Sequence, residues 1–304
     1  LTSTRGCYGS CTFCSLRFHQ GRIVQPRSRD SLIKEAHALI KDPRFKGYIH
    51  DVGGPTANFR APACTRQTLT GKGPCPDREC LFPASCPAIK DDHEELLELL
   101  RVLRNLPGVK KVFIRSGIRF DHLMQAPSEI RKRFLRELSE HHISGQLKVA
   151  PEHASPRTLQ AMGKPPIECF NQFSREFSSA VNAAGKKQYL IPYLIAAHPG
   201  TTLADAAALA EYLHRNKFIP DQVQMFYPTP GTVASCMYAT GLDPRPGSGF
   251  APVHVPMGRE RSLQRSLLHY HKPAEKQKAL EALRKAGRKD LTAVLFGKRK
   301  QSRH

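Results

Sequence analysis

The fold of this chain is decided by one stretch near its start, Arg5-Gly6-Cys7-Tyr8-Gly9-Ser10-Cys11-Thr12-Phe13-Cys14. Its three cysteines have the spacing C-x3-C-x2-C, and they can hold three irons of a [4Fe-4S] cluster, whereas a closed site needs four cysteine ligands. The fourth iron would keep an open position for chemistry. Gly6 and Gly9 let the backbone bend closely around an inorganic core. A structural zinc site, which needs a fourth ligand, and unligated core cysteines are the alternatives, but both leave this grouping unexplained.

This spacing, with an aromatic residue before the last cysteine, resembles the signature of the radical S-adenosylmethionine (SAM) enzymes. The resemblance implies that Cys7, Cys11 and Cys14 ligate the cluster, that SAM chelates the open iron, and that Phe13 packs against the adenine. It also implies that the reduced cluster cleaves SAM and that the 5'-deoxyadenosyl radical takes a hydrogen atom from a substrate, which the sequence does not identify. The cofactor carries this chemistry. An electron donor such as a flavodoxin or a ferredoxin is the implied partner.

Length and composition bound the class of protein. The chain has 304 residues and begins at Leu1, directly before the cysteine loop, so we expect a fragment that lacks an N-terminal region. No apolar run approaches the ~20 residues that a membrane-spanning helix needs, and nothing resembles a signal peptide. The nine cysteines are odd in number and have the spacings of metal loops. We therefore expect a cytoplasmic protein without a membrane partner.

The formal net charge is +21, and the excess is concentrated at the end of the chain. Residues 258–304 hold 14 Lys and Arg against 4 Asp and Glu. A basic segment of this kind favours nucleic acid through counterion release, and a solvated basic face or a contact with a missing acidic domain are the alternatives. The sequence predicts a domain over residues 1–257 and a basic segment over 258–304, disordered around residues 298–300.

Short apolar runs alternate with amphipathic helical patterns, which is typical of a parallel α/β fold. Of the helices, the clearest begins at Asp91, which has capping-box spacing to Glu94. Six β/α units make the partial (β/α)6 TIM-like barrel that the radical SAM resemblance implies. The predicted strands are residues 1–4, 47–52, 110–115, 147–149, 188–195 and 222–226, and the predicted helices are 31–41, 91–106, 128–142, 170–184, 201–216, 259–270 and 274–286.

Polar residues follow the predicted strands, and ligands of parallel α/β barrels gather at the carboxyl ends of strands. By the resemblance, Gly53 and Gly54 lie against the methionyl amino group of SAM, although a proline follows them where the family commonly has glutamate. Ser116 and Glu152 are candidates for the ribose hydroxyls or the methionyl group, with a helix N-terminal role as the alternative for Glu152.

Three further residues at strand ends are candidates for chemistry. His153 and His198 are candidate acid or base groups, or they satisfy neighbouring backbone groups. Tyr227 is a candidate for radical quenching or substrate stacking, with core packing as the alternative.

Residues 55–90 interrupt the alternation with a stretch rich in proline, glycine and polar residues. Too little apolar surface is present to order this insertion by burial, so we expect a metal to hold it together. Zinc or a second iron–sulfur cluster would suit four thiolates, and a reduced, mobile insertion is the alternative. The candidate ligands are Cys64, Cys75, Cys80 and Cys86.

Five segments together resemble the YgiQ-type radical SAM proteins, and the similarity spans nearly the whole chain. The hypothesis is a radical SAM enzyme with an unknown substrate. A nucleic-acid-binding protein with a structural or redox-sensing cluster, and an RNA-modifying radical SAM enzyme, are the alternatives. The five segments are residues 5–14, 51–58, 148–153, 193–200 and 226–230.

Overall fold

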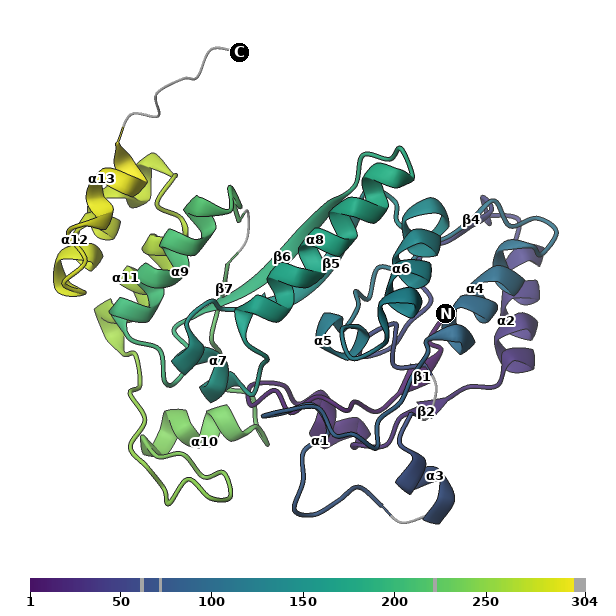
Figure 1. Ribbon diagram of the computed structural model, residues 1–304, viewed down its shortest axis with the longest axis horizontal. Helices are drawn as coiled ribbons and strands as arrows, with labels where there is room; N and C mark the ends of the chain where they lie inside the picture. The colour runs from purple at the N-terminus through teal and green to yellow at the C-terminus, as the bar shows by residue number, and fades with distance from the viewer. Residues whose placement is uncertain (61–62, 71–72, 221–222, 298–304) are drawn as a thin grey trace. The chain divides into compact units, whose positions relative to one another are not determined.

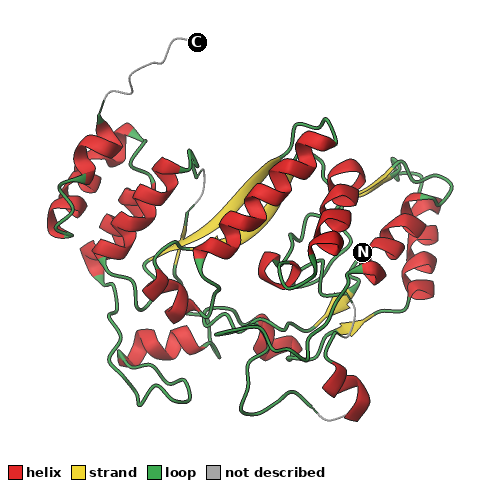
Figure 2. Ribbon diagram, in the orientation of Figure 1, coloured by secondary structure: helices red, strands yellow, loops and turns green. Residues whose placement is uncertain are grey.

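The computed structural model describes residues 1–60, 63–70, 73–220 and 223–297 of the chain. The predicted disorder around residues 298–300 lies outside the described residues, as does the start of the last predicted strand. Figure 2 shows two long strands and several short ones among the helices, and the α/β class predicted from the sequence is confirmed. The elements, labelled in Figure 1, are β1 (Thr4–Arg5), α1 (Leu16–Gln20), β2 (Gln25–Pro26), α2 (Arg29–Lys41), β3 (Tyr48–Ile49), α3 (Thr65–Thr70), α4 (Glu94–Arg104), β4 (Lys111–Val112), α5 (Phe120–Leu123), α6 (Ser128–Glu137), the π-helical turn η1 (Leu138–His142), β5 (Gln146–Glu152), α7 (Pro156–Met162), α8 (Ile167–Ala183), β6 (Tyr189–Ala196), α9 (Leu203–Arg215), β7 (Gln224–Met225), α10 (Val233–Thr240), α11 (Gly258–Leu268), η2 (Pro273–Glu275), α12 (Lys276–Lys285) and α13 (Leu291–Phe296).

The chain divides into two compact units, which we describe separately. Unit 1 contains Leu1–Ser10, Ser15–Ala150 and Glu168–Pro192, and unit 2 contains Cys11–Cys14, Pro151–Ile167 and Tyr193–His304. The division differs from the predicted boundary after residue 257, which stays a prediction.

The strands of unit 1 are short. β3 pairs in parallel with β4, with Ile49 opposite Val112, and a parallel bridge joins Thr2 to Gly53 in the segment that follows β3. The parallel order near the N-terminus is therefore the one expected for consecutive β/α units. β2 was not predicted, and it pairs antiparallel with β1.

Helix α4 has the leucine stripe that the sequence predicts, and it contacts α2 (Figure 1). Its start differs from the prediction, because the capping box does not form. His93 is the N-cap residue, in the left-handed conformation with φ of 58°, and its side chain makes no cap bond. Asp91 accepts the amide of His93 at 2.8 Å instead, which draws the aspartate away from the helix. The five buried leucines of α4 are Leu96, Leu97, Leu99, Leu100 and Leu103.

The longest strands, β5 and β6, form a three-stranded sheet in the order β5-β6-β7. β6 pairs in parallel with β7, with Ile195 opposite Gln224 and Ala196 opposite Met225. Both β5 and β6 have their carboxyl ends in unit 2, so the residues after these strands belong to that unit.

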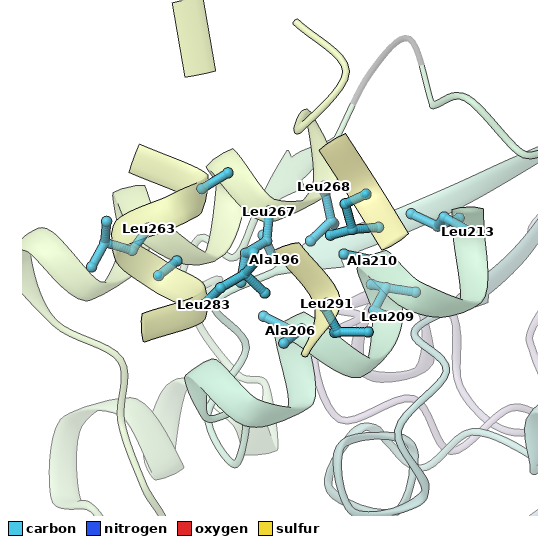
Figure 3. Packing of buried hydrophobic residues seen from close by; sticks show 14 of the residues in the cluster. Ala196, Ala206, Leu209, Ala210, Leu213, Leu263, Leu267, Leu268, Leu283 and Leu291 are labelled. Carbon is cyan, nitrogen blue, oxygen red and sulfur yellow. The ribbon is translucent and has the colours of Figure 1, made fainter. Parts of the chain in front are cut away.

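The C-terminal helices of unit 2 have a well-packed apolar side. Leu263, Leu267 and Leu268 of α11 are buried in one core with Leu283 of α12 and Leu291 of α13. Figure 3 shows these leucines gathered with alanines and leucines of α9. Burial of this apolar area stabilises the helices by roughly 1.5–3 kcal/mol for each leucine. No helix in the part of the chain that the structure describes has both the length and the apolar character of a membrane span.

Candidate functional site

The first part of the cysteine loop, up to Ser10, belongs to unit 1. Its backbone requires glycine at two positions, Gly6 and Gly9. The amide of Gly9 donates to Sγ of Cys7 at 3.3 Å, and a Cβ on Gly9 would lie only 3.2 Å from that sulfur. Gly6 has φ of +82°, and a Cβ there would clash with the carbonyl of Ile23. The backbone therefore wraps closely around the sulfur and donates to it, which favours a thiolate.

A buried guanidinium lies beside this part of the loop. A Cβ on Gly9 would lie 2.9 Å from Nη1 of Arg119, and Nε of Arg119 donates to Asp121 at 2.5 Å. The side chain of Asn58 fixes the backbone there, because it accepts the amide of Arg119 at 2.7 Å and donates to its carbonyl at 3.0 Å. A fixed positive charge near a cluster ligand is one of the factors that set a cluster's reduction potential.

The second part of the loop, residues 11–14, is anchored in unit 2. The amide of Thr12 donates to Met162 at 3.0 Å, its hydroxyl donates to the carbonyl of Ala161 at 2.9 Å, and its carbonyl accepts the amide of Ala234 at 2.8 Å. Cys14 donates its amide to the carbonyl of Cys11 at 3.2 Å, which makes a tight turn. These bonds hold the turn between the end of α7 and the start of α10.

Phe13 is half-buried and packs edge-on against the ring of His198, at 5.8 Å between ring centroids. His198 is fully buried, and both of its ring nitrogens have partners. Nδ1 lies 2.6 Å from the carbonyl of Pro199 and Nε2 lies 3.2 Å from the hydroxyl of Thr12. Burial lowers the pKa of His198 to about 3, so the ring is neutral near pH 7 and carries a single N–H, which Nδ1 donates to Pro199. Nε2 then accepts from the hydroxyl of Thr12, which lies within reach of both this nitrogen and the carbonyl of Ala161. The geometry favours a structural role for His198 in holding the loop.

The residues after β3 form a compact polar group in unit 1. Asp51 accepts the amides of Arg115 and Ser116 at 2.6 and 2.9 Å, and the hydroxyl of Ser116 donates to its other oxygen. A Cβ on Gly53 would clash with that hydroxyl, and one on Gly54 would clash with the carbonyl of Thr4. Both glycines are thus required for close packing at this strand end.

Two non-glycine residues at the ends of β5 and β6 have left-handed backbones. Glu152 has φ of 69° and Ala197 has φ of 59°. Such strain is concentrated at functional sites when the surroundings hold it in place. Glu152 is buried, and its carboxylate lies 3.9 Å from Nζ of Lys164. A helix N-terminal role for Glu152 has no support here, because α7 begins at Pro156.

Of the two remaining candidate residues, His153 is buried and Tyr227 is exposed. His153 is buried, and its Nδ1 accepts the amide of Ser155 at 3.0 Å. Burial lowers its pKa to about 4, so the ring is neutral near pH 7, and its bond to Ser155 favours a structural role. Tyr227 is 79% exposed, and the alternative of core packing was therefore wrong.

The cysteine-rich insertion contacts the first part of the loop within unit 1. Cys64 and Cys80 are buried in one apolar core with Tyr8, and Cys7 and Cys86 pack against it. The core is completed by Val24, Phe59, Ala63, Leu81 and Ile89.

Glu79 fastens this insertion to the segment around the loop. It accepts hydrogen bonds from the hydroxyl of Ser10 at 2.8 Å and from Nη1 and Nη2 of Arg17, each at 2.7 Å. Burial opposes the charge on Glu79, but these two partners and Arg22 lower its pKa. The insertion is therefore tied to the segment that carries Cys7.

Sequence reasoning missed Thr12, Asp51 and Arg119 as site residues. Asp51 lies within the segment 51–58 that carries the family resemblance, but its partners come from the loop after β4, more than sixty residues further along. Arg119 carries no motif of its own. Only the packing of the loop brings it to Gly9.

Residues 1–213 match the family model of the radical SAM superfamily. The match covers more than half of the chain, and the chain belongs to the radical SAM superfamily. Members of this superfamily are enzymes, and the cofactors of the family are a [4Fe-4S] cluster and SAM. The loop fits such a cluster, because it supplies thiol ligands, an amide that donates to sulfur, and glycines where a Cβ would intrude.

The more specific prediction of a YgiQ-type protein is confirmed, since UPF0313 is the name of that family. A UPF0313 protein of Clostridium perfringens strain 13 is 50% identical over 292 residues, and one of Clostridium botulinum strain 657 is 49% identical over the same length. These matches cover 96% of this chain but only 43% and 44% of the relatives. Residues 221–301 also match a domain of unknown function, DUF3362.

Two solved structures share the fold. The cobalamin-dependent SAM radical enzyme OxsB has a TM-score of 0.58 at 15% identity, over 97% of this chain and 46% of that one. The radical SAM methyltransferase TsrM of Kitasatospora setae has a TM-score of 0.50 at 12% identity, over 94% of this chain and 60% of that one. The likeness to OxsB confirms the predicted partial-barrel fold of the radical SAM type.

Proposed function

We propose that this enzyme uses its [4Fe-4S] cluster to cleave SAM reductively and to abstract a hydrogen atom from a substrate. The observation that carries the proposal is the cysteine loop, in which three thiols lie within eight residues and the amide of Gly9 donates to Cys7. When bound, the cluster supplies the electron for cleavage and an iron with an open coordination position.

In this proposal Cys7, Cys11 and Cys14 hold the cluster as thiolates. Phe13 packs against the adenine, and its T-shaped contact with His198 holds the phenyl ring in position. Thr12 keeps Phe13 in place through its bonds to the end of α7.

Four residues at strand ends orient SAM in this proposal. Gly53 and Gly54 allow the methionyl amino group to approach the backbone. Ser116 donates its hydroxyl hydrogen to Asp51, so its oxygen is oriented to accept a hydrogen bond from SAM. Glu152 accepts from the ribose hydroxyls, and its left-handed backbone supports a functional role.

The net charge of +21 supports an acidic electron donor, such as a flavodoxin or a ferredoxin. Opposite charge raises the association rate of such partners and makes it depend on salt. The substrate has no comparable signal in the described residues.

A titration with SAM tests the assigned roles. In the anaerobically reconstituted and reduced protein, the EPR signal of the cluster should change as SAM binds. Loss of one hydrogen bond to a charged group lowers affinity by roughly a factor of 10. We expect a loss of SAM affinity of this size for Glu152→Gln and a somewhat smaller loss for Ser116→Ala. Glu129→Gln and Ser178→Ala, both at exposed helical positions, are the matched controls. Unchanged SAM affinity in Glu152→Gln and Ser116→Ala would remove both residues from the SAM site.

We further propose that Cys64, Cys75, Cys80 and Cys86 bind a second metal centre, either zinc or an iron–sulfur cluster. Positive charge around these thiols supports an anionic four-thiolate site. Arg66 donates to Sγ of Cys75 at 3.5 Å and Arg78 donates to Sγ of Cys86 at 3.8 Å. Burial raises the pKa of Cys80, and the charge of Arg22 opposes this shift. Metal analysis of Cys80→Ser distinguishes the cases: loss of zinc or of iron identifies the metal, and unchanged metal content contradicts the site.

A further inference from the structure

Three side chains with metal-binding atoms meet in unit 1, outside both cysteine sets. They are Asp91, His93 and His122, and one ligand atom from each lies within 4.8 Å of the other two. Nε2 of His122 lies 3.0 Å from Oδ2 of Asp91, and Nδ1 of His93 lies 3.4 Å from the same oxygen. Among the described residues, no other group of three or more histidine, cysteine or acidic side chains brings its ligand atoms this close together.

The local backbone is shaped to bring these groups together. Asp91 follows the insertion directly, and its Oδ1 accepts the amide of His93 at 2.8 Å, which makes a tight turn before α4. His93 has a left-handed backbone with φ of 58°, which is uncommon for a residue with a Cβ. His122 lies in α5, so residues from two segments about thirty positions apart converge on one carboxylate.

The histidines are buried without sufficient partners. The side chain of His93 is 0% exposed and that of His122 is 2% exposed. Both ring nitrogens of His93 and Nδ1 of His122 make no hydrogen bond in the described protein, because the 3.4 Å contact between Nδ1 of His93 and Asp91 lacks hydrogen-bond geometry. Buried polar atoms are nearly always satisfied, so three such atoms in one place indicate a ligand.

The side chains around His93 and His122 do not supply the hydrogen bonds that these imidazoles lack. Aromatic rings pack on the histidines, with Phe59 5.1 Å from His122 and Phe134 5.1 Å from His93 between ring centroids. These rings offer no alternative acceptor or donor for the imidazoles. The hydrogen bond between Asp91 and Nε2 of His122 satisfies that nitrogen, but it leaves Nδ1 of His122 and both nitrogens of His93 without a hydrogen bond.

A cavity of about 450 Å³ adjoins the group and gives access from one side. Asp91 and His122 line it, together with Asp92, Lys90 and Gln125. A cation held by the three side chains would thus keep positions that water or a small ligand can fill from the cavity. Two imidazoles and one carboxylate are donors that suit first-row transition cations.

We propose that Asp91, His93 and His122 form a binding site for a divalent first-row transition cation, of the zinc or iron(II) class. The cation joins the end of the insertion to α5, and its remaining coordination positions face the cavity. The site is separate from the radical SAM proposal, and it does not depend on either cysteine set.

Manganese(II) is the probe that isolates this site, because it prefers oxygen and nitrogen ligands to thiolates. The anaerobically reconstituted chain, with its oxidised and diamagnetic [4Fe-4S] cluster, is titrated with Mn²⁺, and the EPR signal of the free ion is followed. We expect about one bound Mn²⁺ per chain, displaced by Zn²⁺, which binds N and O ligands more tightly. Pulsed EPR of the bound ion should show couplings to imidazole ¹⁴N.

Variants test which residues hold the ion. Asp91→Asn and His122→Gln should lower Mn²⁺ affinity by at least ~10-fold, as expected for changes at metal ligands. His142→Gln, which removes another buried histidine of unit 1, should leave it unchanged. Thermal melting of each variant shows whether it is folded. Absence of Mn²⁺ binding by the folded wild-type chain, or bound Mn²⁺ without nitrogen couplings, would overturn the site whatever the variants do.

Discussion

The side-chain oxygen of Gln264 accepts a hydrogen bond from the backbone amide of Ala197 at 3.0 Å. Its amide group donates to the carbonyl of Thr201 at 2.9 Å, so one buried residue of α11 holds both sides of the turn after β6. The turn contains His198 and the strained backbone of Ala197. The C-terminal helices therefore support a strand end of the radical SAM domain.

Gln264→Leu should destabilise the chain by about 2–4 kcal/mol, because it leaves a buried amide and a buried carbonyl without partners. Chemical denaturation measures the change. Gln277→Leu, at an exposed position of α12, is the control and should cost less than about 0.5 kcal/mol. Equal effects of the two substitutions would show that the turn does not depend on Gln264.

Gly9→Ala should reduce the iron bound after reconstitution and destabilise the loop by about 1–3 kcal/mol, as overpacking does. The added methyl would lie 2.9 Å from Arg119 and 3.2 Å from Sγ of Cys7. Gly73→Ala is the matched control, since a Cβ there meets nothing within 4 Å. Normal iron content in Gly9→Ala would mean that the loop has room that the structure does not show.

Glu79→Gln should loosen the insertion, because the ion pair with Arg17 is lost and the bond to Ser10 is weakened. Hydrogen exchange of residues 73–90 should become faster, with less change in α4. Asp77→Asn, an exposed neighbour, is the comparison. Identical exchange in the two variants would argue against Glu79 as the fastening residue.

Stability should fall as the pH falls below the ordinary histidine pKa. Burial lowers the pKa of His153 to about 4, so between about pH 6.5 and pH 4 the unfolded chain binds a proton that the folded chain does not. Stability thus decreases toward acid in this window, by at most roughly 1.4 kcal/mol per pH unit for this residue. Urea unfolding at several pH values should show a smaller slope for His153→Gln, and an unchanged slope would refute the assignment.

Local patterns predicted much of the fold. The leucine spacing of α4 and the apolar runs of β5 and β6 follow from periodicity, and the observed elements lie close to the predicted ranges. The short helices α1, α3, α5, α7, α10 and α13 were missed, because helices of eight residues or fewer leave little periodic signal. The two basic helices predicted near the end form, and their apolar positions complete a buried core with α9.

The candidate site was only partly visible in the sequence. Cysteine spacing pointed to the loop, but the partners of Thr12, Asp51 and Arg119 come from distant segments and depend on packing. The net charge overestimates how many basic side chains of the C-terminal segment are unpaired, since Arg259 pairs with Glu281 and Arg288 pairs with Glu211. The group of Asp91 and two histidines was hidden by a plausible capping-box pattern.

The most direct test of the proposed activity is a product assay. The chain is reconstituted anaerobically with iron and sulfide, supplied with SAM and a strong reductant, and examined by chromatography for 5'-deoxyadenosine. The account predicts 5'-deoxyadenosine from the wild-type chain and none from Cys11→Ala. A wild-type preparation with an intact [4Fe-4S] cluster that yields no 5'-deoxyadenosine would contradict reductive cleavage of SAM and favour a structural or redox-sensing cluster.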